Sequence, residues 1–102
     1  MHSLIESHRE AIADLCRLHG VRKLDVFGSA IRDDFDPQRS DVDVLVEFEP
    51  RVSASFSNLV ALKTALERLL GCPVDVLELH AIRNRRLRYY IEKSKAPIYT
   101  AE

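Results

Sequence analysis

Two apolar runs joined by a polar loop decide the fold: Val26-Phe27-Gly28-Ser29 and Ser40-Asp41-Val42-Asp43-Val44-Leu45-Val46-Glu47-Phe48. Successive side chains of a strand point to opposite faces, so the second run predicts a strand with Asp41 and Asp43 on one face and apolar side chains on the other. Two carboxylates this close repel each other unless a cation lies between them. Magnesium suits such oxygen ligands, since it takes one or two carboxylates and completes its shell with water and substrate phosphates.

A third carboxylate, Asp75, stands in a similar apolar run, Pro73 to Leu79. A charge in such a setting is costly and calls for a partner, and any one of the three aspartates could be an ordinary ion-pair residue. Taken together with a Gly-Ser turn, they are better explained by a metal site. Gly28 permits close approach of the backbone to a ligand. The Ser29 hydroxyl and the amides of a following short helix would hold a phosphate.

Hydrophobic periodicity predicts helices and strands along the whole chain. The expected helices cover 3–19, with Ser3 and Glu6 as a capping box, 30–34, 57–70 and 82–93. The expected strands cover 21–27, 41–48 and 73–79, with an edge strand at 97–100. No linker or repeat interrupts this order. It predicts an α/β (α+β) fold, a small mixed sheet packed by helices, in a single domain over 1–102.

The composition and charge of the chain limit the classes of function that it can have. The chain has 102 residues, 46% of them hydrophobic and 30% charged, and a net charge of −1, so no overall positive field draws it to nucleic acid. Cys16 and Cys72 belong to no metal-ligand spacing and are expected to be reduced and buried, which fits a cytoplasmic protein. No apolar run approaches the ~20 residues of a membrane span.

The motif resembles a known family. Phe27-Gly28-Ser29, Arg32, Asp34-Phe35 and the segment from Ser40 to Phe48 are similar to the minimal nucleotidyltransferases (MNT domains) of the DNA polymerase β superfamily, and Pro73-Val74-Asp75 matches the family's third aspartate. The resemblance covers nearly the whole chain and implies a polymerase β-like palm. Two features depart from the family pattern. Eleven residues separate Ser29 from Asp41, one more than is usual, and Asp33 stands where the family often has glycine.

The resemblance also implies a function. Many such proteins are antitoxins of type VII-like HEPN/MNT pairs, which transfer AMP from ATP to a tyrosine of a HEPN-domain ribonuclease toxin. Asp41 and Asp43 would then hold two Mg²⁺ ions, and Asp75 would join the ion nearest the incoming hydroxyl. Gly28 and Ser29 would hold the phosphates of ATP. Arg32 would either contact phosphate or a neighbouring carboxylate, or lie in a solvated loop.

Two other functions remain open: a non-catalytic antitoxin that covers the toxin, and a nucleotidyltransferase for a small molecule such as an aminoglycoside, which would need a helper chain. The basic cluster near the C-terminus could line the nucleotide pocket, meet an acidic partner or form a solvated helix face; it comprises Arg83, Arg85, Arg86 and Arg88. Three tyrosines are expected to be packing residues, although one could lie beside the adenine: Tyr89, Tyr90 and Tyr99.

Overall fold

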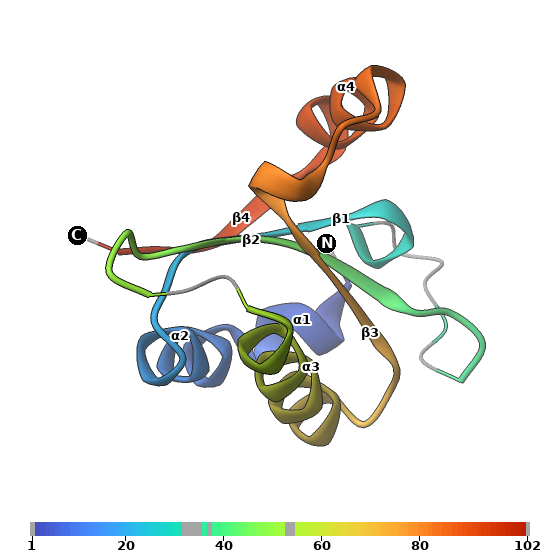
Figure 1. The fold of residues 1–102 in the computed structure, drawn as a ribbon. Coiled ribbons are helices and arrows are strands. Elements are labelled where there is room, and N and C mark those ends of the chain that lie inside the picture. Colours follow the sequence, from blue (N-terminus) through green and yellow to red (C-terminus); the bar gives the residue numbers. More distant parts are fainter. Residues whose placement is uncertain (1, 32–35, 37, 53–54, 102) are drawn as a thin grey trace.

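The computed structural model describes residues 2–31, 36, 38–52 and 55–101, apart from the side chain of Ser29. The elements run in the order α1 (Ser3–Ser7), α2 (Arg9–Leu18), β1 (Val21–Phe27), the 3₁₀ helix η1 (Gly28–Ile31), β2 (Val42–Phe48), α3 (Phe56–Leu70), β3 (Val74–Glu78), the 3₁₀ helix η2 (Leu79–Ala81), α4 (Arg85–Ser94) and β4 (Ala96–Thr100) (Figure 1). The predicted α/β arrangement of a mixed sheet and packed helices is confirmed.

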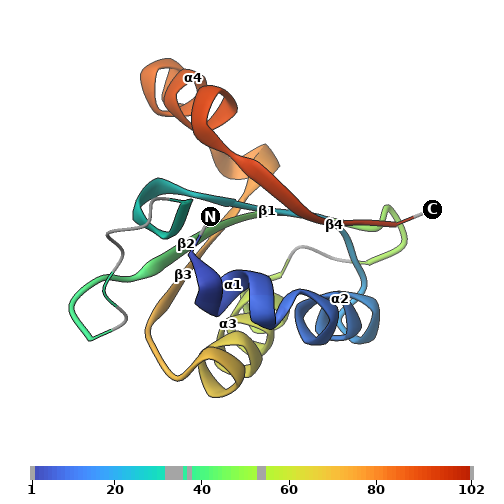
Figure 2. The same ribbon diagram turned by 180° about the vertical axis from the view of Figure 1, so that it is seen from behind.

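The four strands form one sheet in the order β3-β2-β1-β4. Strand β1 is antiparallel to both β2 and β4, whereas β2 and β3 are parallel. Helices α1, α2 and α3 cover one face of the sheet, and α4 lies on the other face and projects away from the body (Figures 1 and 2). The parallel pair β2 and β3 is therefore joined by α3, which crosses one face.

The main core fills the space between the sheet and helices α1 to α3. Its strand side chains come from the apolar face predicted for the second run, where Val42, Val44, Val46 and Phe48 are buried. The leucine stripe of α3 packs on this face through Leu62, Leu66 and Leu70, and both cysteines are free and buried, as expected. The opposite face carries a smaller cluster in which Ile91 of α4 packs on Phe27 and Leu45. This second face is thus left partly open.

Local differences from the sequence-based expectations have identifiable causes. The helix predicted over 3–19 is divided at His8 into α1 and α2. The expected capping box is wrong: the ring Nδ1 of His2 accepts the hydrogen bond from the Leu4 amide at 3.0 Å, while Glu6 pairs with Arg9 at 2.9 Å. Since Glu6 is engaged by an arginine on the next turn, it does not close a box with Ser3.

Helix α3 has a capping residue at each end. The Ser55 side chain accepts a hydrogen bond from the Asn58 amide, and Gly71 ends the helix in the left-handed conformation. The short helix expected over 30–34 begins earlier, at Gly28, and residues 32–35 lie outside the described part of the chain. Across the described residues, no helix has both the length and the apolar character needed to cross a bilayer.

The prediction that the α4 tyrosines pack in the interior is wrong. Tyr89 is 63% exposed and Tyr90 52% exposed, because α4 projects from the body and contacts it mainly through Ile91. Tyr99 behaves as expected and packs against the main core from β4.

Candidate functional site

Two of the three predicted carboxylates face each other across the parallel strands β2 and β3. In the register of this pair, Asp43 lies opposite Asp75, just as Val42 lies opposite Val74. Because Val42 and Val74 are buried in the main core, the two aspartates point to the opposite, partly open face. Asp41 precedes β2 and is exposed. The sheet therefore brings Asp43 and Asp75 together directly, and Asp41 stands at the entry to the same strand.

The charges of the other two aspartates act on Asp43. Burial raises the pKa of Asp43 from 3.8 to about 6, and the charges of Asp75 and Asp41 and a side-chain hydrogen bond with Asp75 act in the same direction. Burial and neighbouring like charges both disfavour the charged form of a carboxyl group, and a bound cation would offset them. The arrangement therefore favours a cation at Asp43.

The end of β1 lies against this carboxylate. Phe27 is opposite Asp43 in the antiparallel register, and Gly28 follows with a φ of +74°. A Cβ atom at residue 28 would lie 2.5 Å from Oδ2 of Asp43, so a larger residue would displace this carboxylate, and the positive φ separately favours glycine. The backbone of Ser29 continues into η1, while its side chain and all of Arg32 lie outside the described residues, as does Asp33 of the longer loop.

A lysine and a glutamate that the sequence patterns did not single out support Asp75 from α3. Lys63 donates a hydrogen bond to the Val74 carbonyl, and its Nζ lies 4.0 Å from Oδ1 of Asp75. The Glu67 carboxylate accepts a hydrogen bond from the Val74 amide at 3.0 Å and pairs with Lys63 at 3.5 Å. Strand β3 lies at the edge of the sheet, so these two side chains take the place of a neighbouring strand. The spacing of four residues between Lys63 and Glu67 predicts an ion pair within a helix, but it does not predict that this pair contacts β3.

The donor set suits a magnesium ion that is completed by substrate. Within the described ranges, no three or more His, Cys, Asp or Glu residues form a ready-made metal cage. Asp43 and Asp75 nevertheless supply two facing carboxylates, with the charge of Asp41 nearby. Magnesium sites that bind nucleotides commonly use one or two carboxylates, and substrate phosphates and water supply the remaining ligands.

The C-terminal arginines lie at the surface of the protein, as Asp41 and Asp75 do. All four are exposed: Arg83, which precedes α4, and Arg85, Arg86 and Arg88 on this helix. Arg83 borders an apolar groove together with Leu59, Val76 and Leu87.

Comparison with known proteins places the chain in a family. Residues 8–99 match the sequence model of the family described as "Nucleotidyltransferase domain". Two proteins of Methanocaldococcus jannaschii are similar, each named "Putative protein adenylyltransferase". MJ0435 is 38% identical over 78 residues, which cover 76% of this chain and 81% of the relative. MJ1379 is 30% identical over 90 residues, which cover 88% of this chain and 86% of the relative.

Solved structures share the fold. A "putative minimal nucleotidyltransferase" superposes with a TM-score of 0.76 at 35% identity and covers 91% of each chain. A toxin–antitoxin structure with AMP-PNP gives a TM-score of 0.74 at 18% identity, covering 92% of this chain and 74% of the other. The complex of a tri-AMPylated Shewanella oneidensis HEPN toxin with an MNT antitoxin gives 0.69 at 16% identity, covering 94% and 72%. The chain thus belongs to the nucleotidyltransferase domain family and has the polymerase β-like fold of its minimal members, as the spacing of the Gly-Ser turn and the aspartates predicts.

Proposed function

We propose that the chain is a protein adenylyltransferase that moves AMP from ATP to a tyrosine of a HEPN-domain ribonuclease toxin and thereby acts as an antitoxin. The observation that carries the proposal is Asp43 opposite Asp75, with Gly28 packed against Asp43. The M. jannaschii relatives are named as protein adenylyltransferases, and one structural neighbour is an MNT antitoxin with an AMPylated HEPN toxin. Both support a protein acceptor.

The residues have separate roles in this proposal. Asp41 and Asp43 would hold two Mg²⁺ ions, with Asp75 on the acceptor side; bound there, the ions would stabilise the attacking and leaving oxygens. The turn at Gly28 and Ser29 would hold the phosphates of ATP, with Arg32 as a further phosphate contact. The tyrosyl oxygen forms a bond to the α-phosphorus while the bond to the β-phosphate oxygen breaks. Pyrophosphate leaves, and Asp75 favours loss of the hydroxyl proton.

The test is to incubate the chain with labelled ATP, Mg²⁺ and a HEPN-type protein encoded beside it. We expect label on a toxin tyrosine and a loss of at least about 100-fold in transfer rate for Asp41→Asn or Asp43→Asn, since a metal supplies several kcal/mol of transition-state stabilisation. Asp14→Asn is a matched control, because Asp14 is an exposed helix residue paired with Arg17. Transfer by Asp43→Asn at the rate of the unchanged protein would refute the proposal.

The exposed side chains of α4 support a second candidate function, that of a non-catalytic antitoxin. This helix exposes Leu87, Tyr89 and Tyr90, large side chains that a partner protein could cover. Toxin inhibition that survives the double change Asp41→Asn and Asp43→Asn would favour this role over transfer.

A further inference from the structure

Strand β3, which carries Asp75, has a free edge. It is the last strand of the sheet on its side, so only β2 pairs with it. The Val42 amide donates a hydrogen bond to the Pro73 carbonyl at 2.9 Å, which shows that the backbone groups of Pro73 face β2. Because these groups point to alternate sides along a strand, those of Val74, Val76 and Glu78 point away from β2.

Only part of this edge is open. The amide and carbonyl of Val74 are bound by Glu67 and Lys63 of α3. In the part of the chain that the structure describes, the outward amides and carbonyls of Val76 and Glu78 have no hydrogen-bond partner. Unpaired backbone groups in a row are a template for pairing with a strand of another chain.

An apolar groove of about 330 Å³ lies beside the open part of the edge. Its walls come from three elements: Leu59 of α3, Val76 of β3, and Ile82 and Leu87 at the start of α4 and just before it. When a peptide adds to the edge of a sheet, its backbone supplies affinity and pockets for its alternate side chains supply specificity. This edge offers both the free backbone groups and a pocket beside them.

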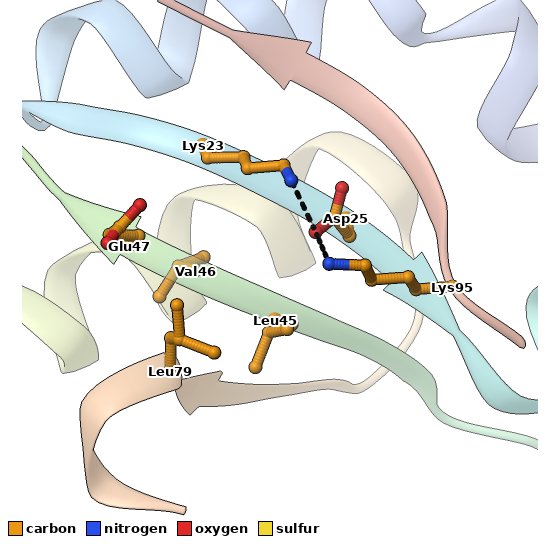
Figure 3. A pocket seen from close by; sticks show the side chains of 7 residues that line it. All are labelled: Lys23, Asp25, Leu45, Val46, Glu47, Leu79 and Lys95. Carbon is orange, nitrogen blue, oxygen red and sulfur yellow. Dashed lines mark ion pairs between the residues drawn. The ribbon is translucent and has the colours of Figure 1, made fainter. Parts of the chain in front are cut away.

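The groove also contains a buried carboxylate without a counterion. Two charged side chains of the described residues are buried, Asp25 at 2% exposure and Glu78 at 9%. Asp25 is neutralised, since its Oδ2 lies 3.6 Å from Nζ of Lys95 and 3.9 Å from Nζ of Lys23 (Figure 3). Glu78 lines the groove and has no hydrogen bond or ion pair with any other described residue, and its oxygens are not fully enclosed. A buried carboxylate of this kind calls for a donor from outside the chain.

The rim of the groove is basic. Arg83 lines it, and three more arginines follow on α4: Arg85, Arg86 and Arg88. All four are exposed, and none forms an ion pair with a described carboxylate. The guanidinium group is well suited to binding carboxylates at an interface. An acidic partner is therefore the charge complement of this rim.

We propose that the free edge of β3 and this groove, together the edge groove, dock an acidic, extended segment of the acceptor protein, which pairs with Val76 and Glu78 as an added strand. The inference rests on the proposed function and identifies how its acceptor is held. Carboxylates of the segment contact the arginines of the rim. A tyrosine of the segment, distinct from the one that receives AMP, places its ring against the apolar walls and donates its hydroxyl to Glu78, since tyrosine joins an apolar body to a neutral donor.

The closed part of the edge directs the docked segment to the carboxylate site. Because Lys63 and Glu67 occupy the outward groups of Val74, the added strand cannot extend past Val76 along β3. It therefore leaves the edge beside Asp75, at the spacing of about 4.8 Å between paired strands. The residues that follow are brought to Asp75, the carboxylate that the proposed function places on the acceptor side.

The test is the equilibrium affinity of the chain for the HEPN-type protein encoded beside it, measured by calorimetry without ATP and Mg²⁺, so that catalysis plays no part. Arg83→Glu reverses a charge at the rim, and Leu87→Asp places a charge in an apolar wall. We expect each to weaken binding at least about tenfold, the loss found at central interface positions. Both residues are exposed, so the fold should tolerate the changes. Arg68→Glu and Leu18→Asp are matched controls at exposed positions outside the groove and should leave the affinity unchanged.

Two further variants test the strand pairing and the buried carboxylate. Val76→Pro removes an outward N–H that β2 does not use, and proline is tolerated at such edge positions. It should weaken binding about two- to tenfold, the value of one hydrogen bond. Glu78→Met should weaken binding about tenfold or more, because the partner's hydroxyl is then buried without an acceptor. The same change should raise the urea midpoint of the isolated chain, since an unpaired buried carboxylate destabilises it. A purely structural role of Glu78 would lower that midpoint.

Kinetics separate this inference from the proposed function. In Arg83→Glu the KM for the acceptor should rise about tenfold while kcat stays unchanged, because docking is weakened and the carboxylate site is intact. AMP transfer together with unchanged affinity in Arg83→Glu and Leu87→Asp, or with equal losses in their controls, would overturn the edge groove and keep the adenylyltransferase. Binding that depends on Arg83 and Leu87, without AMP transfer, would keep the edge groove and remove the proposed chemistry.

Discussion

The backbone of Gly28 passes so close to Asp43 that a Cβ atom at residue 28 would lie 2.5 Å from the Oδ2 of this aspartate. Where the end of β1 approaches the start of β2, residue 28 lacks the side chain that would meet this carboxylate. Any larger residue would have to displace the carboxylate or the turn that begins η1.

Gly28→Ala is expected to destabilise the fold by about 1–2 kcal/mol through the left-handed backbone and, separately, to reduce AMP transfer by about 100-fold or more, because Asp43 must move. Gly71→Ala is the matched control. Gly71 has nearly the same φ, +73°, but a Cβ atom at residue 71 would have no described neighbour within 4 Å, so only the backbone strain should appear. Urea unfolding and transfer kinetics on both variants check this; equal transfer by the two variants would contradict it.

Much of the fold follows from short-range patterns in the sequence. The alternation from Val42 to Phe48 predicts a strand with one core face, and the leucine spacing of α3 with Gly71 at its end predicts a helix and its stop. These features depend on neighbours a few residues away, so periodicity captures them. The Gly-Ser and Asp-x-Asp spacing identifies the family for the same reason, because the turn follows β1 and the aspartates stand at the start of β2, the next strand in the chain and its neighbour in the sheet.

Other features depend on contacts between distant segments. The Lys63 and Glu67 contacts with Val74 and the burial of Asp25 arise from tertiary packing. Tyr90 is exposed although it belongs to the helical pattern of Leu87, Tyr90 and Ile91, because the helix has little to pack against. Periodicity identifies which side of a helix is apolar, but not whether another element covers it.

The raised pKa of Asp43 predicts a specific pH dependence of stability in metal-free protein. Its ordinary pKa of 3.8 applies to the unfolded chain and about 6 to the folded one, so the folded state binds more protons between these values. Stability should therefore fall as pH rises from about 4 to about 6 and stay lower above it. In EDTA, Asp43→Asn should be more stable than the unchanged protein at pH 7.5 and equal to it near pH 4.

Thermal unfolding at both pH values measures this difference, with Asp14→Asn as the control for loss of a carboxylate elsewhere. Excess Mg²⁺ should raise the stability of the unchanged protein at pH 7.5, since a cation removes the repulsion, and should have less effect on Asp43→Asn. If Asp43→Asn were less stable than the unchanged protein in EDTA at pH 7.5, the charge of the Asp43 carboxylate would already be compensated by a neighbouring group.

The contacts of Lys63 and Glu67 with Val74 predict that α3 positions Asp75. Lys63→Met removes the donor to the Val74 carbonyl and the ammonium 4.0 Å from Asp75. We expect a loss of stability of about 1 kcal/mol, the net value of one hydrogen bond, faster exchange of the β3 amides and about tenfold slower AMP transfer. Arg68→Met, at an exposed position of the same helix, should change none of these. Fast amide exchange confined to other strands would contradict the assignment.

Truncation of two neighbouring residues of α4 should change the stability of the chain to very different extents. Ile91 is 1% exposed and packs with Phe27 and Leu45, so Ile91→Ala should destabilise the chain by about 2–5 kcal/mol. Tyr90 is 52% exposed, and Tyr90→Ala should change stability by no more than about 0.5 kcal/mol. Urea unfolding of the isolated chain measures both, and a large loss in Tyr90→Ala would mean that α4 packs through its tyrosine face, as its spacing alone suggests. Helix α4 contacts the open face that carries Asp43, so Ile91→Ala should also slow AMP transfer. Tyr90→Ala should affect only the steps that need a partner protein.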